Sequence, residues 1–163
     1  MHKEEAAQLI GIDNARAELI VMLLPASHGN GDSDVSAGSS SSRKMKIVSV
    51  VGVGGLGKTT LAKAVYDELQ SQYDCRAFVP IGRTPDLAQV FSNILYLLNK
   101  NEYTNIHNVK DQSLLIGELR KFLQNKRYFI VIDDVWDITT WNIIKSALVN
   151  NDIGSRVITT TRN

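Results

Sequence analysis

The sequence has 163 residues, with 18 lysines and arginines against 17 aspartates and glutamates, and a net charge of +1. A chain of this length makes one domain with a buried core. Balanced charge gives no electrostatic case for nucleic-acid binding. No apolar run reaches the roughly 20 residues that span a bilayer, and the single cysteine, Cys75, suits a reducing compartment. We therefore expect a cytoplasmic protein without a nucleic-acid partner or a membrane span.

Hydrophobic periodicity divides the chain into alternating helices and strands. An amphipathic helix is predicted over residues 14–24, and the Ser- and Gly-rich stretch that follows predicts a flexible linker. The expected strands cover residues 45–53, 76–81, 128–133 and 156–161, and the expected helices cover residues 58–72, 86–98, 111–123 and 141–148. Strands that alternate with helices favour a parallel α/β sheet. The first strand is apolar on both faces, so we expect both faces to be buried.

A glycine-rich loop follows the first predicted strand and fits the pattern G-x-x-x-x-G-K-[ST]. Glycines allow successive backbone N–H groups to point inward at the start of a helix, whose dipole favours negative charge. We expect Lys58 to bind the β- and γ-phosphates, the Thr59 hydroxyl to bind Mg²⁺, and Thr60 to add a phosphate contact. The predicted nucleotide-binding residues of this loop are Gly52, Val53, Gly54, Gly55, Leu56, Gly57, Lys58, Thr59 and Thr60.

Two later strands run into polar residues. The strand over residues 128–133 is followed by a second acid, which gives the pair Asp133 and Asp134. Ligands of open α/β sheets lie at the carboxyl ends of the strands, so Asp133 is expected to act on Mg²⁺ through water. Asp134 either orients the attacking water, as a catalytic residue, or begins a turn. After the last strand, Arg162 is either a surface residue or a partner of a γ-phosphate, which suits its planar guanidinium.

The segments GVGGLGKTT, FIVIDDVW and GSRVITTTR occur in that order, and together they resemble the NB-ARC nucleotide-binding domain of plant NLR disease-resistance proteins. Trp136 is typical of the coiled-coil branch of that family. The resemblance implies a P-loop NTPase three-layer α/β fold with a parallel sheet in the order 1-4-3-2. Because the sequence stops at Asn163, we expect the family's fifth strand to be missing and the fold to be truncated.

The same resemblance assigns roles to residues. It implies that Ile10, Gly11 and Ile12 lie near the adenine of a bound nucleotide. It also implies that Lys58 is needed for nucleotide, that Asp133 is the Mg²⁺ acid and that Arg162 senses the γ-phosphate.

We therefore expect a turn and helix over residues 1–24, a flexible linker over 25–44, and a truncated nucleotide-binding subdomain over 45–163. The implied cofactors are ADP or ATP with Mg²⁺, and any ATPase activity is at most weak. In the intact protein the module is expected to be a nucleotide-dependent switch in innate immunity. Its implied partners are adenine nucleotide and the other domains of a longer NLR chain, with oligomerisation of the intact protein.

Two other interpretations stay open on the sequence. One is a free-standing P-loop ATPase or kinase, although no Arg-rich lid follows the third strand. The other is a truncated remnant that keeps the motifs without binding nucleotide. A GTPase is disfavoured because the guanine-specifying N-K-x-D is absent, and the closest segment, residues 99–102, ends in Glu.

Overall fold

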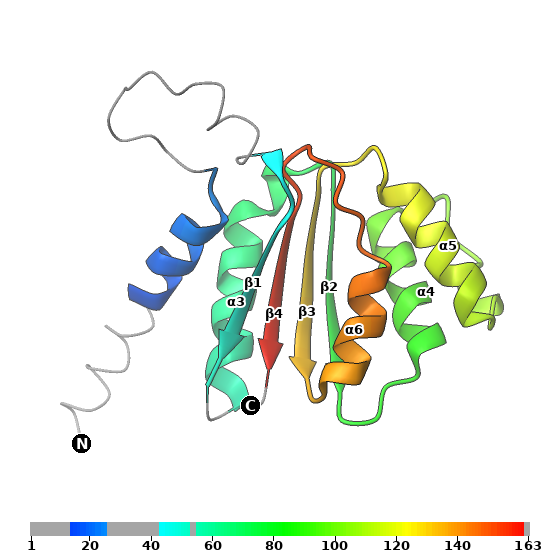
Figure 1. Cartoon of the computed structure of the whole chain (residues 1–163), viewed down its shortest axis with the longest axis horizontal. Coiled ribbons are helices and arrows are strands. Elements are labelled where there is room, and N and C mark those ends of the chain that lie inside the picture. The colour runs from blue at the N-terminus through cyan, green and yellow to red at the C-terminus, as the bar shows by residue number, and fades with distance from the viewer. Residues whose placement is uncertain (1–13, 26–42, 53–54, 162–163) are drawn as a thin grey trace.

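The computed structural model describes residues 14–25, 43–52 and 55–161. Within these residues, four parallel strands form one sheet in the order β1-β4-β3-β2 (Figure 1). The strands are β1 (Lys46–Val51), β2 (Cys75–Gly82), β3 (Tyr128–Val135) and β4 (Arg156–Thr161). The predicted α/β class and strand order are confirmed. Pro80 lies in β2, which is at the edge of this sheet. No described strand pairs with the outer side of β2, so the missing N–H of Pro80 interrupts no hydrogen bonds there.

The helices lie on both sides of this sheet. A first helix covers residues 14–23, and the others are α3 (Gly55–Leu69), α4 (Leu87–Leu98), α5 (Gln112–Leu123) and α6 (Ile138–Ser146), with short 3-10 helices η1 (Gln70–Gln72) and η2 (Ile106–Asn108). Of the helices in the described part of the chain, none combines the length and apolar character needed to cross a membrane.

Aspartate caps determine where three of these helices begin. The Asp86 carboxylate accepts a hydrogen bond from Gln89 N at 3.3 Å and begins α4, and Asp111 begins α5 by accepting from Ser113 N at 2.9 Å. Both helices were predicted to within one residue. The predicted helix over residues 141–148 is wrong at both ends, because the Asp137 cap begins α6 at Ile138 and the helix ends at Ser146.

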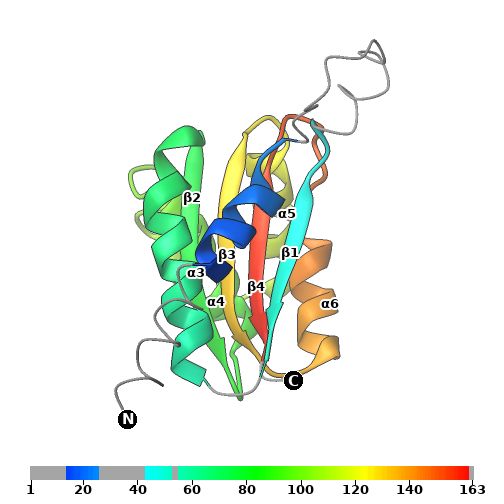
Figure 2. The same cartoon turned by 90° about the vertical axis from the view of Figure 1, so that its left-hand side faces the viewer.

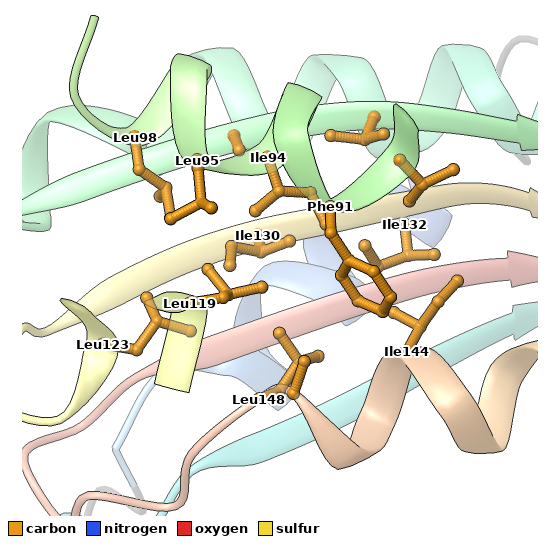
Figure 3. Close-up of a cluster of buried hydrophobic side chains, with 14 of the residues drawn as sticks. Phe91, Ile94, Leu95, Leu98, Leu119, Leu123, Ile130, Ile132, Ile144 and Leu148 are labelled. Atoms are coloured by element: carbon orange, nitrogen blue, oxygen red, sulfur yellow. The ribbon is translucent and has the colours of Figure 1, made fainter. Parts of the chain in front are cut away.

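The sheet separates two hydrophobic clusters, which gives three layers. On one face, α4, α5 and α6 pack on alternate strand residues such as Ile130 and Ile132 (Figure 3). On the other face lie α3 and the helix over residues 14–23 (Figure 2). These helices pack on the intervening residues, such as Phe129 and Val131. Alternation along β3 therefore supplies both clusters, and β3 is buried along its length apart from partly exposed Asp134.

The first strand differs from its prediction. Ser49 is exposed and the Val51 side chain is 61% exposed, so the expectation that β1 is buried on both faces is wrong. In the described residues β1 pairs with β4 alone, and α6 packs mainly against β3. The apolar residues of β1 are therefore only partly covered by described elements.

The buried guanidinium of Arg156 joins the first helix to the sheet. This side chain is fully buried at the start of β4, where Nε donates to Leu23 O at 2.5 Å and Nη1 donates to Lys44 O at 3.0 Å and Ser155 O at 2.8 Å. Burial lowers the pKa of the guanidinium below its ordinary value. The Leu23 carbonyl lies at the end of the helix over residues 14–23, so Arg156 provides that helix end with a charged donor.

Arg156→Met should lower the free energy of unfolding by about 3 kcal/mol or more, because it leaves buried carbonyls without their charged donor. Urea unfolding followed by circular dichroism measures the change. The matched control is Arg16→Ala, which removes the partly exposed ion pair to Glu68 at 2.5 Å and should cost at most about 1 kcal/mol. Equal losses for the two variants would contradict the role given to Arg156.

Candidate phosphate-binding site

The carboxyl ends of β1, β4 and β3 lie side by side at one edge of the sheet, because the strands are parallel and adjacent (Figure 1). The helix α3 begins at Gly55, close after the end of β1, so its N-terminus lies at this edge. At Gly57, within the first turn, a Cβ added to the backbone would meet no atom within 4 Å. The packing of the chain itself therefore does not require a glycine at this position, and the space beside it is open.

Lys58 reaches from α3 to the ends of two strands. Its ammonium Nζ donates to Gly52 O, directly after β1, and to Thr161 O, at the end of β4. These acceptors lie far apart in the sequence and meet because β4 pairs with β1. Lys58 thus places a positive charge at the N-terminus of a helix, the arrangement that favours a bound anion.

Thr59 and Asp133 form the second part of the site. The Thr59 hydroxyl donates to the Asp133 carboxylate, at 3.1 Å from Oδ1 and 3.0 Å from Oδ2. Asp133 is 4% exposed, and its Oδ1 also accepts a hydrogen bond from the Thr160 hydroxyl at 2.5 Å. A hydroxyl and one carboxylate are hard oxygen ligands of the type that suits Mg²⁺, which completes its shell with water and phosphate. Among the described residues there is no cluster of three or more His, Cys, Asp or Glu side chains for a metal held by protein alone.

Asp134 occupies an irregular position in β3. Between the pairs Ile132↔Thr159 and Val135↔Thr161, β3 has one more residue than β4, which makes a β-bulge. Asp134 has φ 62°, in the left-handed region, and its backbone N–H donates to Thr160 Oγ1 at 2.8 Å. The sequence predicted a turn or a catalytic role here; the structure shows a backbone role, and the role of the carboxylate stays a prediction.

Several predicted site residues come together at this edge, namely Gly52, Lys58, Thr59 and Asp133. Gly55, Leu56 and Gly57 belong to the first turn of α3, and Thr60 is exposed in the next. The predictions for Ile10, Gly11, Ile12, Val53, Gly54 and Arg162 lie outside the described residues. Sequence reasoning missed the contacts of Thr160 and Thr161, for which the only signal was the run of threonines that ends β4.

A separate cavity of about 580 Å³ lies on the other face of the sheet. Its walls include Ser49 and Thr159 from the strands and Ile138 and Trp141 from α6. These strand residues face away from α3, because Thr159 alternates with Thr160, whose hydroxyl contacts Asp133 on the α3 side. The cavity is therefore distinct from the site formed by Lys58 and Asp133.

A parallel sheet in the order 1-4-3-2, with a glycine-rich loop leading into α3 and an acid near the end of β3, defines a P-loop NTPase-like fold. Comparison with known families agrees: the NB-ARC domain matches residues 36–163. The chain belongs to the NB-ARC family, the nucleotide-binding module of plant disease-resistance proteins of the NLR class.

The individual relatives are plant proteins whose names refer to resistance. Disease resistance protein RGA5 of Oryza sativa subsp. japonica is 31% identical over 161 residues, which cover 98% of this chain and 13% of RGA5. ToMV resistance protein Tm-2(2) of Solanum lycopersicum is 37% identical over 119 residues, 72% of this chain and 13% of that protein. Disease resistance protein Pik-1 of rice is 32% identical over 131 residues, 73% of this chain and 12% of Pik-1. The chain thus spans about an eighth of the length of these relatives.

Substitutions at Asp134 separate its backbone role from any role of its carboxylate. Asp134→Gly should leave the free energy of unfolding unchanged or slightly raise it, since glycine adopts a positive φ without strain, whereas Asp134→Val should lower it by about 1–2 kcal/mol. Urea unfolding of both variants tests this. A glycine variant as unstable as the valine variant would show that the carboxylate, and not the backbone conformation, stabilises the bulge.

Proposed function

We propose that this chain binds ADP or ATP together with Mg²⁺ at the edge formed by β1, β4 and β3. The observation that carries the proposal is the convergence of the Lys58 ammonium with the Thr59 and Asp133 oxygens at the start of α3. Positive charge and a helix N-terminus favour phosphate, and hard oxygens suit a divalent cation that bridges phosphates. The membership of the NB-ARC family supports nucleotide as the ligand.

Each residue has a defined task in this proposal. Lys58, which contacts Gly52 O and Thr161 O in this structure, would bind the β- and γ-phosphate oxygens, and the backbone N–H groups of the glycine-rich loop would donate to the phosphates. Thr59 and Asp133 would hold the cation, the Thr59 hydroxyl as a ligand and Asp133 through water. When bound, Mg²⁺ neutralises phosphate charge and orients the phosphate chain. The open space beside Gly57 fits this task, because a phosphate group can approach the backbone there.

Further parts of the proposal rest on the sequence and on membership of the family. Ile10, Gly11 and Ile12 contact the adenine, Arg162 senses the γ-phosphate, and Asp134 orients water in a hydrolysis that is at most slow. Residues 1–24 precede the module, residues 25–44 link it, and residues 45–163 form it. In a longer cytoplasmic disease-resistance protein, exchange of ADP for ATP changes contacts with other domains and permits oligomerisation.

Lys58→Ala should weaken ADP binding at least about thirtyfold, because it removes the positive charge that meets the phosphates. Isothermal titration calorimetry with the 163-residue chain measures the change. Lys63→Ala is the matched control, since Lys63 lies on the same helix but forms an exposed pair with Asp67 at 3.3 Å. Equal affinities of Lys58→Ala and the unsubstituted chain would rule out the phosphate-binding assignment.

Asp133→Asn should remove most of the gain in ADP affinity that Mg²⁺ provides, about tenfold or more, because the carboxylate charge holds the hydrated cation. The measurement compares ADP affinity in Mg²⁺ with ADP affinity in EDTA. Binding in EDTA should persist, since Lys58 is unchanged. If the asparagine variant gains as much from Mg²⁺ as the unsubstituted chain does, Asp133 is not the metal acid.

A further inference from the structure

The Thr160 hydroxyl lies between the carboxylate of Asp133 and the backbone of Asp134. It donates to Asp133 Oδ1 at 2.5 Å and accepts from Asp134 N at 2.8 Å. Thr160 is 2% exposed, so water does not readily replace either contact. A hydroxyl has one proton to donate, and here that proton goes to a carboxylate, which makes the bond charge-assisted and short.

The bulge in β3 explains why a side chain makes these contacts. Three residues of β3, from Asp133 to Val135, lie opposite Thr160 and Thr161 of β4. The bulge interrupts the regular ladder, and the Asp134 N–H turns to the Thr160 side chain. One hydroxyl therefore connects the backbone of the bulge to the carboxylate that precedes it.

The two threonine hydroxyls that donate to the Asp133 carboxylate are not equivalent. Thr59 donates to both carboxylate oxygens, at 3.0 and 3.1 Å, and in the proposed function its oxygen turns to the cation. The bond from Thr160 Oγ1 reaches only Oδ1 and comes from the neighbouring strand. It therefore remains when Thr59 binds the cation, and it leaves Oδ2 directed toward Thr59.

We infer that Thr160 is a positioning residue for Asp133, which it orients toward a divalent cation bound with nucleotide phosphate. This inference rests on the proposed function. The metal gains affinity when the carboxylate is already oriented, because less conformational freedom is lost on binding. Thr160 itself does not contact the cation, and its effect passes through the Asp133 carboxylate.

The neighbouring Thr159 offers a matched control. It is also 2% exposed and also uses its hydroxyl in a side-chain hydrogen bond, to Ser49 Oγ at 2.9 Å. Its side chain lies on the opposite face of the sheet and lines the cavity there. Thr160→Val and Thr159→Val therefore remove the same group from adjacent, equally buried positions, and only the first touches Asp133.

The test measures ADP affinity of the 163-residue chain in EDTA and in increasing Mg²⁺. In Thr160→Val, the increase in ADP affinity that Mg²⁺ provides should be about tenfold smaller than in the unsubstituted chain. Its ADP affinity in EDTA should change less than about twofold. Thr160→Ser, which keeps the hydroxyl, should retain the gain, and so should Thr159→Val. A Thr160→Val chain that keeps the full gain, or that loses affinity equally in EDTA, overturns the inference. Thr160→Ala, which is smaller, replaces Thr160→Val if that variant does not fold.

A second measurement needs no ligand. In two-dimensional NMR spectra of the nucleotide-free chain, the Asp133 carboxylate carbon and the Asp134 amide should shift in Thr160→Val and stay in place in Thr159→Val. Unshifted signals in Thr160→Val would show that the hydroxyl does not hold these groups in solution. If the unsubstituted chain gains nothing from Mg²⁺, the metal part of the proposed function fails and the inference fails with it. If the unsubstituted chain gains ADP affinity from Mg²⁺ and Thr160→Val gains as much, only the inference fails.

Discussion

The pairing of β4 between β1 and β3 is the constraint on which the candidate site depends. Lys58 follows β1 in the sequence, Asp133 belongs to β3, and β4 comes later than both. Only when β4 is inserted does Lys58 reach Thr161 O, and only then does Thr160 reach Asp133. The fourth strand in sequence order thus completes contacts between elements that precede it in the sequence.

The neighbouring strands β4 and β3 carry two buried charged side chains, one at each end of the sheet. Each of these side chains has polar partners. Arg156 at the start of β4 is surrounded by backbone carbonyls, whereas Asp133 near the end of β3 is surrounded by hydroxyl donors. Burying a charge is costly unless hydrogen bonds replace its hydration. The hydrogen bonds of Arg156 attach the helix over residues 14–23 to the sheet. Those of Asp133 hold its carboxylate at the candidate site, where a cation can reach it.

Much of this arrangement follows from local sequence signals. The glycine-rich loop, the acidic pair and the caps at Asp86 and Asp111 each have a short-range physical cause, so periodicity and motif predicted α4 and α5 to within one residue. The helix α3 was also predicted, but both of its predicted ends lie three residues too late. The start of α6 was missed because Ile138, which is 69% exposed, carries no core periodicity, and the Asp137 cap was not recognised.

The contacts of Thr160 and Arg156 could not be derived in this way. The contacts of Thr160 depend on which residue of β4 lies opposite Asp133, where a bulge changes the register by one position. The contacts of Arg156 depend on where the helix over residues 14–23 and the residues just before β1 lie beside β4. A sequence shows that β4 is rich in threonine, but not which hydroxyl faces an acid. The exposure of Val51 has a similar origin, since it depends on the place of β1 in the sheet and not on its composition.

The end of β4 belongs to two different environments at once. Thr160 turns its side chain to Asp133, while Thr159 and Thr161 on either side turn theirs to the cavity beside α6. Thr161 also presents its backbone carbonyl to Lys58. Adjacent residues of a strand cannot move independently, so a shift of this strand end that alters the Lys58 contact also alters the wall of the cavity. The site and the cavity, although on opposite faces of the sheet, are therefore built in part from the same three consecutive threonines.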